Sequence, residues 1–279
     1  MKNLFETTGD RLLPPGAAMP LSAGPSSAGP SSSRPLPAGP AWLCLLGGFD
    51  LTYDGQSLRV STSAQRLLAH VAVTCRDRPV RRAALAERLW PDTSTSQATA
   101  NLRSVLWRLP RPRGRQLVRC DTTTLRLSPD LSVDLWEAER LASLCCGPVG
   151  HRPLPDGDLA VLGEDLLPDW DDPWLEVERE SYRQRRLHAL ESCAHRLREE
   201  GRYVDALGAG LAAVQSEPLR ETAHRRVIEV HLAEGNQAEA LRQFDGYRRM
   251  LRDELGIPPS PAIRELVAPL LGRPLDRSA

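Results

Sequence analysis

The stretch of sequence that decides the fold is residues 96–109, SQATANLRSVLWRL. Pro110 follows it directly, so we expect a helix from about Ser96 to Leu109 that ends at the proline. At 100° per residue, one side of this helix is apolar and carries Leu102, Val105, Leu106 and Leu109. The opposite side is small, polar or cationic and carries Gln97, Ala100, Ser104, Trp107 and Arg108, with Asn101 and Arg103 at its edges. The pattern predicts one face for a protein core and one face for water or a ligand.

The residues before this helix predict a small antiparallel sheet followed by two more helices. Strand-like runs cover Leu43–Phe49, Leu51–Tyr53 and Leu58–Val60, with Asp54-Gly55 as a tight-turn signal. Ser61–Ser63 can cap a helix whose apolar residues are Leu67, Leu68, Val71 and Ala72. A second helix, Arg82–Leu89, is stopped by Trp90-Pro91-Asp92.

The residues after it predict a hairpin, because Leu117–Cys120 and Leu125–Leu127 flank the polar turn Asp121–Thr124. Strands, three helices and a hairpin in this order are typical of a winged helix-turn-helix, in which the third helix reads DNA and the hairpin is the wing. Short side chains at the centre of the outer face would let Arg, Asn and Gln reach base edges and phosphates in a major groove. For the helix alone, an ordinary solvated face is the better explanation; the surrounding strands, second helix and hairpin favour the DNA-binding interpretation instead.

Charge is divided unevenly along a chain whose net charge is zero. Residues 41–127 hold 14 arginines against 6 acidic residues, and residues 128–279 hold 19 arginines against 28. Phosphates would attract the first segment and repel the second. Lys2 is the only lysine, however, so the arginine content also reflects codon usage typical of a GC-rich genome.

The second half contains a repeat. EGRYVDAL at 200–207 is echoed by EGNQAEAL at 234–241, and Gly201 and Gly235 are 34 residues apart, the tetratricopeptide period. Ala213 and Pro218 take the places of the small residue at a helix crossing and of the terminating proline. The expected helices are Pro173–Glu199, Arg202–Ser216, Arg220–Ala233, Gln237–Leu255 and Pro261–Leu271. Stacked helix pairs of this kind form surfaces for protein partners.

These patterns predict a mainly α chain with a small β component. We expect a Pro/Gly/Ser-rich disordered tail at 1–40, a winged helix-turn-helix at 41–130, an all-α tetratricopeptide-like domain at 131–272 and a short tail at 273–279. No apolar stretch is long enough to span a membrane, and no secretory leader is recognisable, so we expect a cytoplasmic protein. The six cysteines have no C-x-x-C spacing, which favours free thiols over a disulfide framework.

A search for catalytic chemistry gives no coherent constellation, so we expect no enzyme, cofactor or metal. A P-loop needs the motif G-x-x-x-x-G-K-[ST], and Lys2, the sole lysine, does not stand in one. The sequence GAGLAA at 208–213 matches a dinucleotide fingerprint but lies inside a repeat helix. The histidine pairs 188/195 and 224/231 lack completing metal ligands, and the acidic run from Glu164 to Asp172 lacks calcium-loop spacing and is interpreted as a solvated connection.

The chain resembles the Streptomyces antibiotic regulatory protein family of actinobacterial transcription activators over residues 42–271. In the first half the resemblance rests on LLGGFDL at 45–51, QRLL at 65–68, LAERLWPD at 85–92 and ANLRSVLWRL at 100–109. In the second half it rests on VDLWEAERL at 133–141, LLPDWDDPWLEVERE at 166–180, RLHALE at 186–191, EPLRE at 217–221, HLAEGNQAEALRQF at 231–244 and LRDELGIPPSP at 251–261.

The resemblance implies a winged helix joined to a bacterial transcriptional activation domain. It implies binding to direct repeats near the −35 region, recruitment of RNA polymerase holoenzyme through its σ subunit, control of a secondary-metabolite gene cluster, and a homodimer or side-by-side pair on DNA. Its DNA-binding positions correspond here to Arg103, Ser104, Trp107 and Arg108 on the reading helix, Arg66 and Trp90 at phosphates, and Thr122 and Thr123 in the wing; Gln97 and Asn101 join them from the face analysis above.

The sequence departs from the family pattern at two places. Pro110 and Pro112 interrupt the basic run that commonly extends the reading helix, which would move its phosphate contacts to Arg111, Arg113 and Arg115. No ATPase or phosphopeptide-binding module follows the helices. Two other functions fit the patterns: a tetratricopeptide adaptor that binds no DNA, and a repressor that uses the same DNA-binding fold.

Overall fold

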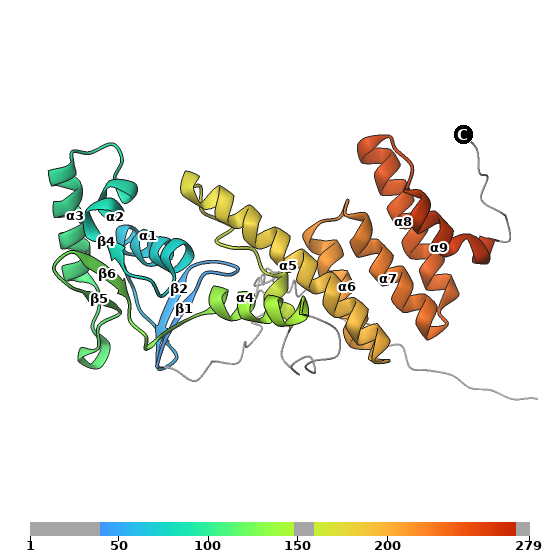
Figure 1. Cartoon of the computed structure of the whole chain (residues 1–279), viewed down its shortest axis with the longest axis horizontal. Helices are drawn as coiled ribbons and strands as arrows, with labels where there is room; N and C mark the ends of the chain where they lie inside the picture. The colour runs from blue at the N-terminus through green and yellow to red at the C-terminus, as the bar shows by residue number, and fades with distance from the viewer. Residues whose placement is uncertain (1–39, 148–158, 272–279) are drawn as a thin grey trace, which may run out of the picture. The chain divides into compact units, whose positions relative to one another are not determined.

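The computed structural model describes residues 40–147 and 159–271 (Figure 1). Most of the expected tail at 1–40, and the one at 273–279, lie outside these residues. The described chain is mainly helical, with seven short strands near its start. It contains a winged helix-turn-helix followed by stacked helices, so the predicted fold class is confirmed.

The first sheet has the strand order β3-β2-β1-β7. It is formed by β1 (Ala41–Cys44), β2 (Asp50–Tyr53), β3 (Gln56–Ser57) and β7 (Leu131–Val133). Asp54 and Gly55 have φ values of 48° and 78°, as a two-residue hairpin turn requires. This tight turn places the pairing at Tyr53↔Gln56 and Thr52↔Ser57. The expected strand at Leu58–Val60 is wrong, because the strand begins directly after the turn, at Gln56–Ser57, and of the expected segment only the Leu58 N–H continues the pairing, donating to the Leu51 carbonyl at 2.7 Å.

Three helices and a second sheet complete the winged helix. The helices are α1 (Thr62–His70), which runs into a π-helical turn at Val71–Cys75, α2 (Arg82–Leu89) and α3 (Thr95–Arg108). Ser61 and Ser94 cap α1 and α3, each accepting a backbone N–H with its hydroxyl. The second sheet, β4-β6-β5, contains β4 (Val80–Arg81) and the hairpin β5 (Val118–Cys120) and β6 (Thr124–Leu127). The expected wing hairpin is confirmed.

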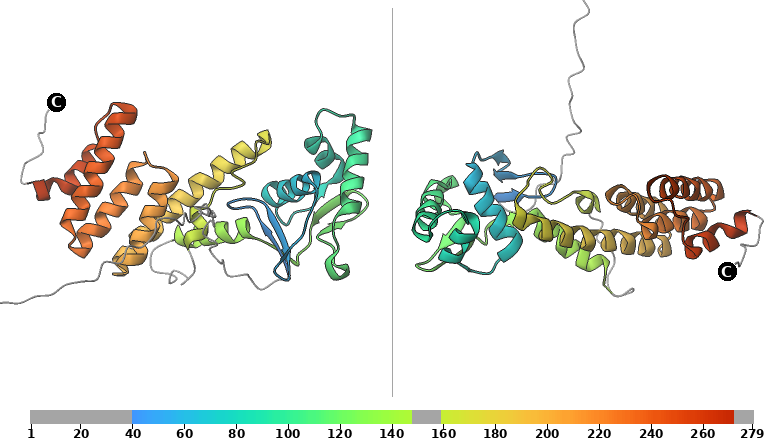
Figure 2. Two further views of the ribbon diagram at one scale, coloured as in Figure 1. Left: turned by 180° about the vertical axis from the view of Figure 1, so that it is seen from behind. Right: turned by 90° about the horizontal axis from the view of Figure 1, so that it is seen from above.

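The remaining helices pack one against the next in chain order, a stacking visible in both views of Figure 2. They are α4 (Asp134–Cys145), α5 (Pro173–Glu199), α6 (Tyr203–Ser216), α7 (Glu221–Glu234), α8 (Gln237–Leu255) and α9 (Pro261–Leu271), with a 3-10 turn at Leu159–Gly163. α4 and α5 run parallel, because Glu139 pairs with Arg185 and Cys145 lies against Cys193 further along both helices. Gly201 and Gly235 both have the left-handed φ that ends a helix, at 73° and 86°, and Ala213 is fully buried. The predicted 34-residue repeat therefore corresponds to real helix pairs.

A buried carboxylate joins the first sheet to the helices. Asp134 is fully buried at the start of α4, and its two oxygens accept the backbone N–H groups of Leu45, Leu46 and Leu135 at 2.6–3.0 Å. Leu45 and Leu46 directly follow β1, and β7 pairs with β1 in parallel just before Asp134. One side chain thus satisfies donors of the sheet and of the helix that leaves it.

Two cysteines form a disulfide, which corrects the expectation of six free thiols. Cys145 at the end of α4 and Cys193 in the middle of α5 are joined across the helix packing, with Cα atoms 5.5 Å apart. The packing of α4 on α5 brings together residues 48 positions apart, which cysteine spacing cannot reveal. Cys44, Cys75, Cys120 and Cys146 are not in disulfides.

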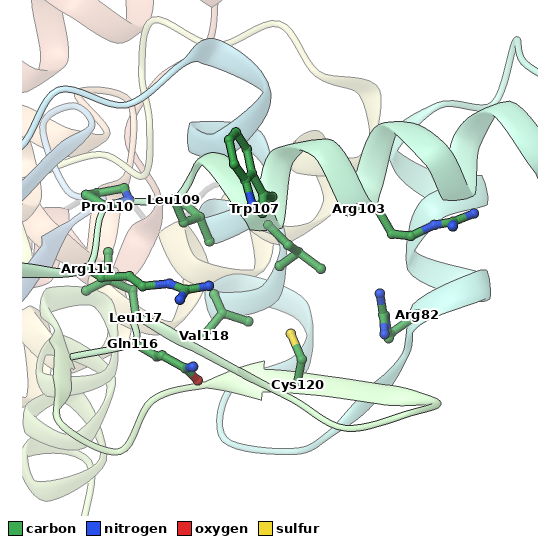
Figure 3. Close-up of a pocket in the computed structure, with 11 residues that line it drawn as sticks. Arg82, Arg103, Trp107, Leu109, Pro110, Arg111, Gln116, Leu117, Val118 and Cys120 are labelled. Carbon is green, nitrogen blue, oxygen red and sulfur yellow. The ribbon is translucent and has the colours of Figure 1, made fainter. Parts of the chain in front are cut away.

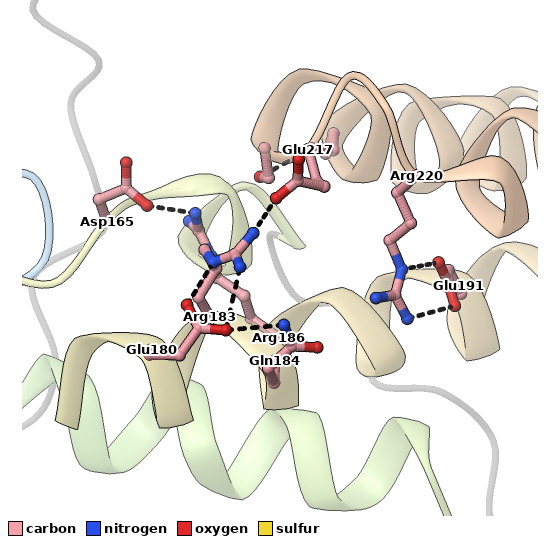
Figure 4. A network of polar contacts seen from close by, with 10 residues as sticks. Asp165, Glu180, Arg183, Gln184, Arg186, Glu191, Glu217 and Arg220 are labelled. Atoms are coloured by element: carbon pink, nitrogen blue, oxygen red, sulfur yellow. Dashed lines mark hydrogen bonds and ion pairs between the residues drawn. The ribbon is translucent and has the colours of Figure 1, made fainter. Parts of the chain in front are cut away.

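Arginines of α5 bind the acidic segment that precedes it, so that segment is more than a solvated connection. Arg186 is buried and pairs with Asp165, while Arg179 donates to the backbone carbonyls of Leu166, Leu167 and Trp170 at 2.6–3.0 Å. Figure 4 shows that α5 also contacts residues that follow α6. Arg183 pairs with Glu180 and Glu217, and Glu191 accepts hydrogen bonds from Arg220 with both oxygens.

Asp134→Ala tests the junction of sheet and helix. The variant leaves the N–H groups of Leu45 and Leu46 buried without an acceptor, so we expect the free energy of unfolding to fall by about 3 kcal/mol in urea denaturation. Asp130→Ala is the control, because Asp130 is exposed and its arginine partners are 3.9–4.0 Å away, and it should cost less than about 0.5 kcal/mol. Equal losses for the two variants would contradict this role of Asp134.

Two glycines of α6 test the packing of the repeat. A Cβ at Gly208 would meet no atom within 4 Å, so Gly208→Ala should raise the free energy of unfolding by about 0.5–1 kcal/mol. A Cβ at Gly210 would lie 3.0 Å from Cγ2 of Val227 on α7, and Gly210→Ala should gain less or destabilise. Thermal or chemical denaturation of the two variants measures the difference, and a larger gain at Gly210 would show that α6 and α7 are not this close.

Candidate nucleic-acid interface

The outer face of α3 is exposed and carries cations without protein partners. Leu102 and Val105 are buried on the inner side, and Trp107 on the outer side is 79% exposed. Arg103 and Arg108 are exposed and make no ion pair or side-chain hydrogen bond with any described residue. Two guanidinium groups on this face are therefore available to a ligand.

The remaining predicted positions on α3 lie along the same helix. Gln97 is exposed, and its side-chain amide donates to the side-chain oxygen of Asn101 at 3.1 Å. Ser104 and Asn101 are half-buried, and Leu106, expected on the inner side, is also only half-buried. The helix thus brings together Gln97, Asn101, Arg103, Ser104, Trp107 and Arg108.

A basic groove of about 230 Å³ separates α3 from the wing. Figure 3 shows Arg103 and Arg82 beside each other at one end and Arg111 at the other, with Cys120 of β5 on the wing side. Arg82 also donates to the backbone carbonyl of Asp121 at 3.3 Å, which ties α2 to the wing turn. Three arginines and no acidic side chain line this groove, so its potential is positive.

Arg82 was not among the sequence-based site residues. Nothing in the sequence around Arg82, the first residue of α2, indicates a DNA-binding position. Only the pairing of β4 with β6 places Arg82 beside the wing. Arg111, one of the three arginines expected to take over phosphate contacts after Pro110 ends the helix, lines the groove. Arg113, by contrast, pairs with Asp54 at 2.9 Å.

The wing turn is held by one acidic side chain. One oxygen of Asp121 accepts the backbone N–H groups of Thr123 and Thr124 at 2.8 and 2.6 Å, and the other accepts the Thr124 hydroxyl at 2.6 Å. These hydrogen bonds, with the Thr124 hydroxyl first, lower the pKa of Asp121 from 3.8 to about 2. The turn leaves Thr122 and Thr123 exposed at the tip of the wing.

Two predicted phosphate-contacting residues lie apart from this groove. Arg66 on α1 pairs with Asp172, its guanidinium nitrogens 2.6 and 2.8 Å from the carboxylate. Trp90 is half-buried against the core, where its backbone N–H closes the last turn of α2. The partner of Arg66 is 106 positions away, so the sequence alone did not reveal that this arginine is engaged.

No metal-binding group and no membrane-spanning helix occurs within the described ranges. No three His, Cys, Asp or Glu side chains gather there as a metal site would require. Of the histidines considered above, His188 is exposed, whereas His224 is buried and contacts the Pro218 carbonyl and Gln243. None of the described helices is long and apolar enough to cross a bilayer.

Comparisons with known proteins find relatives among transcriptional regulators. The family described as "Bacterial transcriptional activator domain" matches residues 157–271. "Regulatory protein AfsR" of Streptomyces coelicolor is 27% identical over 230 residues, which is 80% of this chain but 23% of that protein. "Transcriptional regulatory protein EmbR" of Mycobacterium tuberculosis is 29% identical over 251 residues, 83% of this chain and 64% of that protein.

These matches support the resemblance to the Streptomyces antibiotic regulatory protein family that the sequence motifs indicate. A solved structure, "Mycobacterium tuberculosis EmbR in complex with low affinity phosphopeptide", has the same fold, with a TM-score of 0.59 at 22% identity over 86% of this chain and 67% of that one. The chain spans about a quarter of the length of AfsR and under two thirds of EmbR. The fold shared with the EmbR structure agrees with the winged helix and the helix stack described above.

The hydrogen bonds of the wing turn predict a measurable pKa. Asp121 should titrate near 2 by NMR, so the stability that these bonds add is complete above pH 3.8 and is lost as the pH falls towards 2. Thr124→Val removes the hydroxyl donor and should raise the pKa of Asp121 towards 3.8. Thr122→Val is the control, since Thr122 donates no hydrogen bond to Asp121; equal titration in both variants would disprove the turn described here.

Proposed function

We propose that this protein is a transcription activator that binds promoter DNA through α3 and the wing. The observation that carries the proposal is the exposed face of α3, where Arg103 and Arg108 have no partner in the described structure and adjoin a groove lined by arginines. A major groove is wide enough to admit a helix, and arginine can bind guanine edges with two hydrogen bonds. The resemblance to this family supports the same function.

Within this proposal, the residues have different tasks. Arg103, Ser104, Trp107 and Arg108, with Gln97 and Asn101, would face the major groove. Thr122 and Thr123 would meet the backbone or the minor groove at the tip of the wing, and Arg82 and Arg111 would hold phosphates between wing and helix. Arg66 could reach a phosphate only by leaving Asp172, and Trp90 only by its exposed edge, so we rank both below the others.

The partners and the domain boundaries belong to the same proposal. The winged helix would occupy 41–130, extended to Val133 by β7, and the activation domain 131–272. The helix stack would contact RNA polymerase holoenzyme, including its σ subunit, while two copies lie side by side as a pair on direct repeats near the −35 region. Control of a secondary-metabolite cluster, a place in the cytoplasm at the nucleoid and the absence of enzymatic activity follow from the resemblance to family members.

Arg103→Ala and Arg108→Ala test the reading face. Both side chains are exposed and unpaired within the described structure, so the fold should remain intact. We expect each substitution to weaken binding to a repeat-bearing promoter fragment about tenfold in fluorescence anisotropy at 100 mM salt. The loss of a phosphate contact should in addition reduce the slope of log K against log salt by about 1.

Arg249→Ala on α8 is the matched control, because Arg249 is also exposed and makes no ion pair or side-chain hydrogen bond with any described residue. It removes the same charge without touching α3, so its DNA affinity should equal that of the wild type. If Arg103→Ala and Arg108→Ala also bind as the wild type does, α3 is not the reading helix and the proposal fails.

A further inference from the structure

A second hollow, of about 510 Å³, lies between α4, α5 and the residue that follows the π-helical turn, and it shares no residue with the groove beside α3. Its volume is within the range of about 300–1,000 Å³ typical of sites for small molecules. Ala142 and Ser143 line it from α4, and their small side chains leave the space open. Its other principal lining residues are Arg76, Trp136, Glu139, Arg140, Arg185 and His188.

The hollow carries an excess of positive charge. Arg76, Arg140 and Arg185 line it, and Glu139 is its one acidic residue. Glu139 is 9% exposed and is shared by two of the arginines: it pairs with Arg76, and with Arg185 at 2.8 Å. One carboxylate therefore offsets part of a charge of three.

Arg140 is the arginine of this hollow that does not pair with Glu139. It is exposed and makes no ion pair or side-chain hydrogen bond with any residue in the ranges 40–147 and 159–271. Its neighbour Glu139 is already occupied by Arg76 and Arg185. A guanidinium group in a hollow, without a protein carboxylate, favours a bound anion.

Trp136 gives the hollow an aromatic wall. Its indole N–H donates to the backbone carbonyl of Ala72 at 2.9 Å, so the polar atom of the ring is already bonded. Trp136 is half-buried against the core, and what it offers to the hollow is ring carbon. Such a surface favours a flat apolar ligand over a hydrated one.

We infer that this hollow binds a small aromatic anion, a planar ring system that carries a carboxylate or sulfonate. The ring would pack on Trp136, and the acidic group would bind Arg140 and the remaining N–H groups of Arg76 and Arg185. The site joins the π-helical turn of the winged helix to α4 and α5 through Glu139. The inference does not depend on DNA binding.

The probe is 8-anilinonaphthalene-1-sulfonate, an aromatic sulfonate whose fluorescence rises in apolar surroundings, titrated into the full chain. We expect saturable binding to the wild type. Arg140→Gln should weaken it about five- to tenfold, because it removes the charge that pairs with the sulfonate. Arg249→Gln removes the same charge from α8 and should leave the affinity unchanged. Equal affinities in the two variants, or no saturable binding, would overturn the inference.

Cys146 provides a second readout, since this free thiol lines the hollow and Cys120 lines the groove beside α3. Bound probe should slow the alkylation of Cys146 by iodoacetamide, measured by peptide mass spectrometry, and leave Cys120 unaffected. Equal protection of both thiols would overturn the inference. So would displacement of the probe by duplex DNA of unrelated sequence, because these arginines would then belong to a DNA-binding surface.

Discussion

The structure depends on the buried carboxylate of Asp134. Three backbone N–H groups, two at the end of β1 and one in the first turn of α4, converge on it in an interior that water does not reach. Removing an acceptor from such a place leaves the donors desolvated and unpaired, so the carboxylate stabilises the sheet and α4 in this arrangement. β7 pairs with β1 immediately before Asp134. The start of α4 is therefore fixed to the first sheet by backbone hydrogen bonds of β7 and by the side chain of Asp134.

Acidic residues then determine which arginines remain available. In the helical half, several carboxylates are paired with arginines of the same chain: Asp165 with Arg186, Glu191 with Arg220, and Glu139 with Arg76 and Arg185. In the winged helix, Arg113 pairs with Asp54, and Arg66 pairs with Asp172, which precedes α5. No carboxylate of the described residues pairs with Arg103 or Arg108, so these two keep their charge for a partner. The uneven charge along the sequence thus becomes a local positive surface rather than a uniform one.

Local patterns predicted most of the fold. The bounds of α5, α8 and α9 match the expected ones because a proline at the first turn, the glycine of a repeat or an amphipathic run marks each end within a few residues. The wing hairpin and the outer face of α3 followed from the same short-range signals. The expected strand at 58–60 was wrong because the two-residue turn places β3 directly after it, at Gln56–Ser57, and the pairing ends with the hydrogen bond from the Leu58 N–H to the Leu51 carbonyl.

Contacts between distant residues were not predictable. The Cys145–Cys193 disulfide and the Arg66–Asp172 ion pair join positions 48 and 106 apart, and the entry of Arg82 into the groove requires the pairing of β4 with β6. Each depends on how preformed elements pack, which a single sequence does not encode in any short window. The sequence therefore predicted the site residues that lie on α3, and it missed Arg82, which reaches the groove only through the packing of separate elements.

The most direct test of the account is a methylation-interference experiment on a repeat-bearing promoter fragment from the protein's own gene neighbourhood. Dimethyl sulfate marks guanine N7 in the major groove and adenine N3 in the minor groove. If α3 enters the major groove, fragments methylated at guanine N7 within the repeats will be depleted from the bound fraction. Interference confined to adenine N3, or none at any position, would contradict the placement of α3 on DNA.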